Sequence, residues 1–243
     1  MSNKAPLAVV IVGALLLAAG SYYGLAVSPP EEHMGDVQRI LYVHVPTAWS
    51  ALLVLTFAFV CAAAFLITGR WKWDHRLDAS IEMAVVLCFL LSVQGSIWAK
   101  PTWGVWWDWD PRLTTVAVLL TACVGIVALR NFVEDPMKRA TWSAVAMVIA
   151  YIDVPIVYMS VKWWNSLHQK QSTLSSVSRE FLIPWFTNFA GLLLVIIAVI
   201  VVRARTAALR LEQEIAPPLM EDGQSCLSGQ ARLPGLHNEE EVA

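Results

Sequence analysis

The stretch TAWSALLVLTFAFVCAAAFLIT, residues Thr47–Thr68, decides the fold. It contains no charged residue, and a helix needs about 20 predominantly apolar residues to cross a bilayer. Five further stretches are long and apolar enough to do the same: Pro6–Val27, Ala79–Trp98, Leu113–Leu129, Trp142–Val161 and Leu182–Val202. The sequence therefore predicts an all-α integral membrane protein built as a bundle of six transmembrane helices.

The composition agrees with this fold class. Of the 243 residues 57% are hydrophobic and 15% are charged, with a mean hydropathy of +0.57, which excludes an ordinary soluble domain. We expect a membrane domain over 1–203, whose first stretch is a retained span although Lys4 before an apolar run is typical of a signal peptide. The polar remainder, 204–243, is predicted to be a disordered cytoplasmic tail. With a formal net charge of −2 no nucleic-acid partner is indicated.

The distribution of Lys and Arg predicts the orientation, because short cytoplasmic loops carry the excess of positive residues. With six spans, the cations on one side are Arg39, Lys100, Arg112, Lys162, Lys170 and Arg179. The other eleven of the 17 fall on the opposite side, together with both termini. We therefore expect the termini in the cytoplasm and the connections around 28–46, 99–112 and 162–183 in the periplasm, as in a bacterial inner-membrane protein.

The connection 99–112 contains 103-WGVWWDWDPR-112, with four tryptophans in seven residues. An aromatic belt at the headgroups is the ordinary interpretation of Trp near a span end. Here the rings alternate with charges and a second pair, Trp163 and Trp164, lies in the next external loop. The spacing of Trp103, Trp106 and Trp107 also permits a short interfacial helix with one aromatic face. A shelf of indoles suits a large planar ligand, and a porphyrin is the obvious candidate.

A haem needs axial ligands, and iron binds neutral imidazole readily. His44 stands at the external start of the second span, and His168 follows the external end of the fifth. On the same side, His33 lies in the polar stretch SPPEEHMGD and is interpreted as a solvated loop residue. Arg112 and Lys100 are candidate partners for haem propionates. A polar tip at the membrane interface remains the alternative for each histidine.

Two further patterns bear on other classes of function. Asp153 lies mid-span before Pro155, and a single intramembrane acid indicates helix–helix hydrogen bonding rather than an ion pathway. The four cysteines, at 61, 88, 123 and 226, form no CxxC motif, which argues against thiol chemistry. The sequence has no GxxxxGK[ST] motif for ATP, so energy would have to come from a partner.

The segments WGVWWDWDPRLT, HVPTAWS and DVPIVYMSVKWWNSLHQ resemble the tryptophan-rich haem-handling proteins, and in length and span number the cytochrome c maturation protein C family. The resemblance covers about 35–202 and implies transient, non-covalent haem b held by His44 and His168 as axial ligands. It also implies a surface that contacts both haem and the partner protein that accepts the haem. Its residues are Trp103, Trp106, Trp107, Asp108, Trp109, Asp110, Trp163 and Trp164.

The same resemblance implies partners and a role. Haem would be delivered to a periplasmic haem chaperone, maturation protein E, while ABC transporter subunits A and B release the loaded chaperone and a small membrane protein D joins the complex. Membrane lipid surrounds the spans. The implied role is to position haem, and at most to assist its covalent attachment to the chaperone. We therefore expect a delivery subunit and not an enzyme. The alternatives are a membrane electron-transfer cytochrome and a haem or lipid transporter subunit.

Overall fold

The computed structural model describes residues 4–168 and 177–216, nearly all of them helical. The helices are α1 (Lys4–Tyr22), α2 (Leu41–Thr68), α3 (Trp71–Trp103), α4 (Pro111–Phe132), α5 (Pro136–Tyr151), α6 (Asp153–Trp163) and α7 (Arg179–Ile215). A π-helical turn, Tyr23–Val27, extends α1, and a 3-10 turn, Asp36–Ile40, leads into α2.

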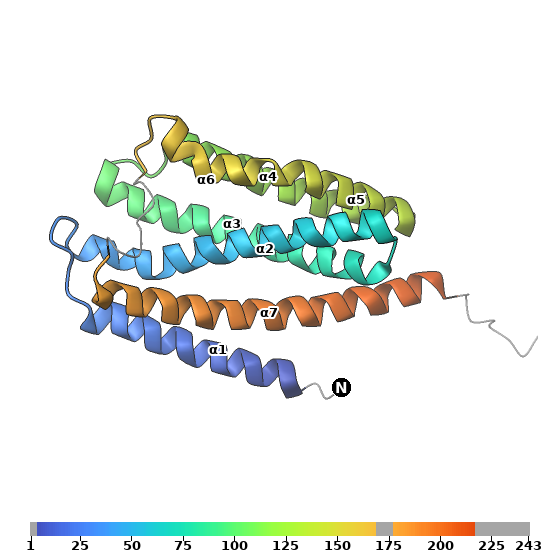
Figure 1. Cartoon of the computed structure of the whole chain (residues 1–243), viewed down its shortest axis with the longest axis horizontal. Helices are drawn as coiled ribbons and strands as arrows, with labels where there is room; N and C mark the ends of the chain where they lie inside the picture. Colours follow the sequence, from blue (N-terminus) through green and yellow to red (C-terminus); the bar gives the residue numbers. More distant parts are fainter. Residues whose placement is uncertain (1–3, 169–176, 217–243) are drawn as a thin grey trace, which may run out of the picture.

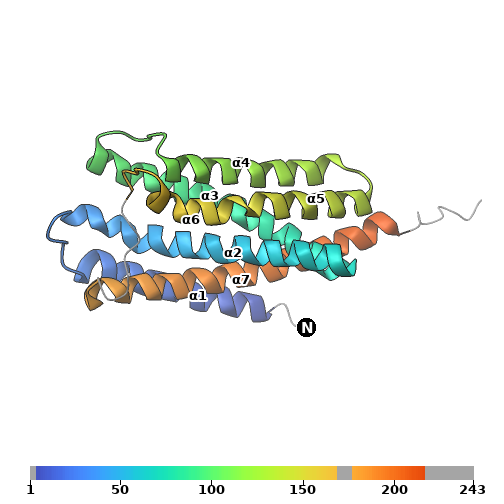
Figure 2. The ribbon, with the colours of Figure 1, turned by 45° about the horizontal axis from the view of Figure 1, so that its top comes forward.

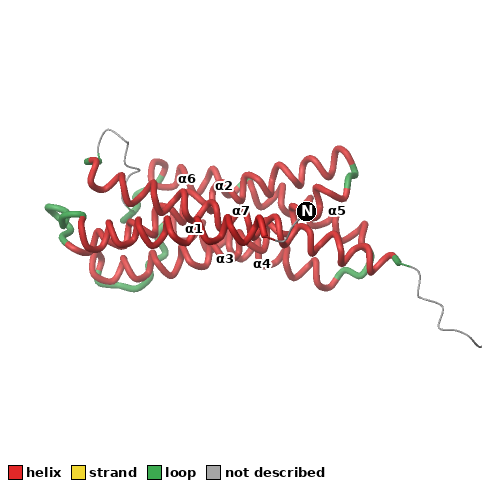
Figure 3. The backbone as a smooth tube through the Cα atoms, turned by 90° about the horizontal axis from the view of Figure 1, so that it is seen from below, coloured by secondary structure: helices red, strands yellow, loops and turns green. Residues whose placement is uncertain are grey.

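Six helical segments are long and apolar enough to cross a membrane, with α5 and α6 together forming the fifth. Each contains one of the six predicted stretches, so the predicted fold class is confirmed. The helices run along one long axis (Figure 1), and the loops gather at its two ends (Figure 3). The chain is therefore a multi-pass membrane protein.

Small residues fill the centre of the bundle while large apolar ones face outward. Ala58, Cys61 and Ala84 are fully buried, whereas Ile67 and Phe132 are more than four-fifths exposed. Small side chains let membrane helices approach closely, and outward apolar side chains are stable only against lipid. This inside-out distribution is the one expected of a bilayer protein.

Helix α2 lies centrally and packs on α3, α5 and α7, while α4 packs on α3, α5 and α6. Helix α1 packs almost entirely on α7 (Figures 1 and 2). Gly13 and Gly191 make that contact possible, because a Cβ on Gly13 would lie 2.8 Å from the Gly191 carbonyl oxygen, and a Cβ on Gly191 would lie 2.7 Å from that of Gly13.

We expect Gly13→Leu to lower the free energy of unfolding by about 1–3 kcal/mol, because the added side chain must push α1 away from α7. Thermal unfolding in detergent measures the loss. Gly125→Leu on α4 is the matched control, since a Cβ there has no neighbour within 4 Å. Equal stabilities of the two variants would contradict the close contact.

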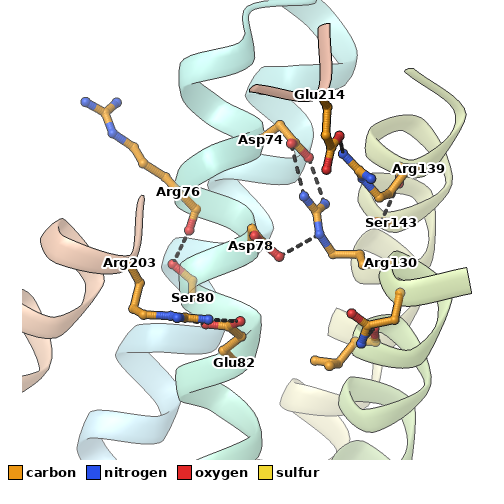
Figure 4. Close-up of polar contacts among 12 residues, drawn as sticks. Asp74, Arg76, Asp78, Ser80, Glu82, Arg130, Arg139, Ser143, Arg203 and Glu214 are labelled. Atoms are coloured by element: carbon orange, nitrogen blue, oxygen red, sulfur yellow. Dashed lines mark hydrogen bonds and ion pairs between the residues drawn. The ribbon is translucent and has the colours of Figure 1, made fainter. Parts of the chain in front are cut away.

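An ion network lies toward the end of the bundle at which α2 meets α3 and α4 meets α5 (Figure 4). The Arg130 guanidinium donates to both carboxylate oxygens of Asp74, at 2.8 and 3.1 Å, and lies 2.6 Å from Asp78. Arg139 pairs with Glu214 at 2.6 Å, and Arg203 pairs with Glu82. Four helices, α3, α4, α5 and α7, are tied together here by charge.

Replacing Arg130 by Met leaves two carboxylates, Asp74 and Asp78, without their shared cation. The side chains of Arg130 and Asp74 are only 10% and 6% exposed, so we expect a loss of about 3–5 kcal/mol in unfolding free energy. Arg205→Met is the control, because Arg205 is exposed on α7 and surface charges contribute about 0–1 kcal/mol. Denaturant titration compares the two; a similar midpoint shift in both would refute the prediction.

Helix α7 corrects the predicted boundary after residue 203. It continues to Ile215, because 204–215 is rich in helix-forming Ala, Leu, Arg and Glu, and because Leu211 is buried and Glu214 is paired. The start of the predicted tail is thus helical, and its remainder, 217–243, lies outside the described residues.

The fifth span is divided at Ile152, between α5 and α6. Pro155 has no N–H to donate to the carbonyl of Tyr151, so the helical hydrogen-bond ladder is interrupted there. Asp153 begins α6, and its Oδ2 is buried without a hydrogen-bond partner in the described part of the chain. The expected helix–helix hydrogen bond is therefore not made by that oxygen.

Candidate functional site

The tryptophan connection joins α3 to α4 at the end of the bundle opposite the ion network. Helix α3 ends at Trp103 because Gly104 takes the left-handed conformation, with φ of 80°, and its N–H bonds to the Lys100 carbonyl at 3.1 Å. Residues 104–110 are not helical. The short interfacial helix considered for this stretch is thus not formed, because Gly104 ends one helix and Pro111 starts the next.

Asp110 is the central polar group of this connection, and it is only 4% exposed. As N-cap of α4, its Oδ1 accepts from the backbone N–H of Arg112 at 2.9 Å. It also accepts from the Ser166 hydroxyl at 3.0 Å, and its Oδ2 accepts from the Leu167 N–H at 2.7 Å. The Ser166 hydroxyl in turn accepts from the His168 N–H at 3.1 Å. Asp110 therefore ties the tryptophan connection to the segment that carries His168.

A largely apolar cavity of about 290 Å³ lies beneath these two connections. Its polar or aromatic lining comes from α2, α3, α4, α6, α7 and both connections: His44, Trp49, Ser92, Trp98, Trp103, Trp107, Arg112, Tyr158, His168 and Trp185. Leu55, Cys88 and Leu119 line its deep end toward the bundle centre and are buried.

Both predicted histidines line this one cavity. His44 is half-buried in the second turn of α2, and its Nδ1 is buried with no hydrogen-bond partner among residues 4–168 and 177–216. The His168 ring lies 6.2 Å from the ring of Trp98. His33, by contrast, is exposed in the turn before α2, where Glu31 accepts from its backbone N–H. The imidazoles of His44 and His168 therefore line the same largely apolar cavity.

The four tryptophans of the connection divide into two sets. Trp103 and Trp107 line the cavity. Trp106 and Trp109 are 59% and 75% exposed and do not line it. Trp163 and Trp164, at 56% and 51%, are exposed as well. One set of rings faces the interior and the other faces outward.

The remaining predicted site residues separate in the same way. Arg112 lines the cavity, and its Nη1 is buried with no hydrogen-bond partner among the described residues. Lys100 is exposed and donates instead to the Gly104 carbonyl at 2.9 Å. Asp108 is exposed, and neither it nor Asp110 lines the cavity. Of the two cations proposed for propionates, Arg112 is the one that faces the cavity.

Three tryptophans that the prediction left out also line the cavity. Trp98 packs edge-on against Trp103 at 5.3 Å, and Trp49 does so against Trp185 at 6.2 Å. An anchor in the headgroups, the ordinary interpretation of a Trp near a span end, does not apply to Trp185, which is buried. For Trp49 the available signal was its helical spacing from Val45 and Leu52, four residues before and three residues after it, because all three lie on the face of α2 that lines the cavity.

A buried contact between α2 and α7 fixes the helix that carries His44. Pro46 cannot donate to the Tyr42 carbonyl, and that carbonyl accepts instead from Asn188 Nδ2 of α7 at 2.8 Å. Asn188 is fully buried, and the Tyr42 hydroxyl accepts from Gln38 at 2.8 Å. The carbonyl that proline leaves unpaired thus anchors α7.

The sequence of this chain is similar to that of a known protein family over most of its length. The sequence model of the family described as "Heme exporter protein C" matches residues 1–217. The chain belongs to the heme exporter protein C family. The membership predicted from the tryptophan motif is therefore confirmed, and the match includes the cavity and both connections.

Named relatives of the heme exporter protein C family are similar over most of their length. The "Heme exporter protein C" of Escherichia coli strain K12 is 32% identical over 207 residues, 84% of this chain and 83% of that protein. That of Bradyrhizobium diazoefficiens is 35% identical over 70% of this chain and 66% of its own. A "Putative cytochrome c biosynthesis ccmC-like mitochondrial protein" of Arabidopsis thaliana is 31% identical over 84% and 80%.

Proposed function

We propose that this protein handles haem in cytochrome c maturation, holding haem b transiently in the described cavity and delivering it to a periplasmic haem chaperone. Membership of the heme exporter protein C family supports the haem-handling role. The observation that carries the site is that His44 and His168 line the same cavity.

The chemistry of the lining fits haem. Neutral imidazole is a common haem ligand, and the Nδ1 of His44 has no protein partner among the described residues. Trp98, Trp103 and Trp107 offer indole faces and edges to a flat conjugated ring. The Nη1 of Arg112 also has no hydrogen-bond partner in the described part of the chain, and its guanidinium suits a propionate carboxylate, because a charge-assisted pair would satisfy both groups.

The outward tryptophans suit a different task. Trp106, Trp109, Trp163 and Trp164 expose large apolar rings beside the cavity, and such exposed groups mark interaction sites. We assign them to the acceptor, the haem chaperone, and assign Trp103 and Trp107 to haem. The ABC transporter subunits A and B and the small protein D would associate elsewhere and supply the energy for release.

The cation distribution supports a periplasmic position of the site. Nine described cations near the end with the ion network outnumber those near the tryptophan end: Arg70, Lys72, Arg76, Arg130, Lys138, Arg139, Arg203, Arg205 and Arg210. The positive-inside rule then favours a cytoplasmic position for that end, in the orientation proposed for a bacterial inner-membrane protein. Haem would therefore be presented where the chaperone resides.

This role requires positioning rather than acid–base chemistry. The bound haem would supply the iron and the reactive ring edge. The chain would hold the iron through two imidazoles, orient the ring between indoles and leave one edge toward the acceptor. Holding two reactants in register accelerates a step without a catalytic side chain, which accords with a delivery subunit rather than an enzyme.

Purification from a haem-sufficient membrane, followed by absorption spectroscopy, tests the proposal. We expect a haem band with the signature of two nitrogen axial ligands, and its transfer to added apo-chaperone. A protein that binds no haem in detergent, even with haem added, would overturn it. Rapid redox cycling with quinol and no transfer would favour the electron-transfer cytochrome instead.

A further inference from the structure

The cavity is walled mainly by four helices, α2, α3, α4 and α6, together with the two connections. Three neighbouring pairs of these helices pack closely, namely α2 with α3, α3 with α4, and α4 with α6. The fourth pair, α6 with α2, does not pack along its length in the described part of the chain. In the described part of the chain, the wall therefore has one side that is not closed by close helix–helix packing.

The division of the fifth span creates this open side. Its first half, α5, packs on α2, where the Tyr151 and Phe59 rings stack at 4.4 Å and the Tyr151 and Thr56 hydroxyls hydrogen-bond at 2.9 Å. Beyond Ile152 the second half, α6, packs on α4 (Figure 1). The fifth span is thus closed against α2 in one half of the bundle and parted from it beside the cavity.

The lining next to this side is mostly apolar. Ala48 and Leu52 line the cavity from α2, and Val154, Val157 and Tyr158 line it from α6. Leu52 and Tyr158 are 38% and 47% exposed, so the cavity lining continues onto the outer surface of the spans. In a membrane protein that surface meets hydrocarbon, and the charged ends of the bundle lie elsewhere.

We propose that the cavity opens sideways into the bilayer between α2 and α6, and that haem reaches the histidines from the lipid through this window. The inference rests on the proposed function, and it names the route by which the ligand arrives. A flat, mostly apolar tetrapyrrole dissolves in hydrocarbon and can slide between two helices edge first. Its carboxylates would stay toward the headgroups, on the side where Arg112 lines the cavity.

A reversible bridge across the window tests the route. In a full-length chain with Cys61, Cys88, Cys123 and Cys226 replaced by alanine, L52C and V157C are joined by a cleavable bifunctional thiol reagent. The protein is reconstituted in vesicles whose bilayer contains haem, and the rise of the haem band is followed. We expect loading to be about tenfold slower or more when bridged, and to recover when the reagent is reduced, which shows that the variant is folded.

The control pair, F59C and Y151C, bridges the same two spans where they already touch, and there we expect no slowing. Unchanged loading of the bridged window pair overturns the route. A lipid with a labelled acyl chain in the same vesicles reports whether the opening holds lipid. If the bridge displaces this acyl chain while haem loads at the same rate, the opening binds lipid and the inference is likewise overturned. Failure to bind haem in detergent at equilibrium, bridged or reduced, would instead refute the proposed function.

Discussion

A protein lacking both His44 and His168 is expected to purify without haem. Removal of both imidazoles takes away the two predicted axial ligands of the iron, and the indoles provide contact area without coordination. Even groups that only orient metal ligands change affinity by about 10–100-fold, so loss of both ligands should exceed that range. Haem titration in detergent, followed by absorption, measures the loss for His44→Ala with His168→Ala.

Each single variant distinguishes the two positions. We expect His44→Ala and His168→Ala to retain weakened binding with the spectrum of one nitrogen ligand, restored toward the original by added imidazole. His33→Ala is the matched control, because His33 lies at the same end of the bundle but is exposed and does not line the cavity. A double variant with a wild-type band would remove both histidines from the site.

Replacement of Asp110 by alanine is expected to lower haem affinity by about 10–100-fold although Asp110 does not line the cavity. Its carboxylate accepts from Ser166 and Leu167 as well as capping α4, so its loss frees the segment that carries His168. The spectrum should then resemble that of His168→Ala, with one nitrogen ligand at partial saturation. Asp110 is in this sense a positioning residue.

Two variants separate positioning from a general loss of charge. Asp108→Ala removes an exposed carboxylate two residues away and should leave the spectrum unchanged. Asp110→Asn keeps an N-cap oxygen and should fall between wild type and Asp110→Ala. If Asp108→Ala and Asp110→Ala shift the haem spectrum equally, the role assigned to Asp110 is refuted.

The six spans could be predicted from sequence because each is an unbroken apolar run, and lipid exposure imposes that composition directly. The residues at which the helices end were harder to predict. Helix α3 continues to Trp103 and α7 to Ile215, since a helix does not have to end where its apolar part ends. Composition measures the membrane-embedded part and says little about the extensions.

The lining of the cavity was predictable in its histidines and only partly in its tryptophans. Position along the chain put the indoles together, but which ring faces inward depends on the turn at Gly104, whose geometry no periodicity reveals. The role of Asp110 had a readable local signal, since Asp followed by Pro is typical of a helix start. Its second role, the bond to Leu167, joins segments distant in sequence and required the fold.

Helix α7 is continuous from one end of the bundle to the other (Figure 1). Its 37 residues correspond to about 55 Å of continuous helix. Near one end Asn188 holds the Tyr42 carbonyl beneath His44, and near the other Arg203 and Glu214 hold partners on α3 and α5. A protein that binds the far end of α7 would therefore contact the same helix that holds the backbone beside His44.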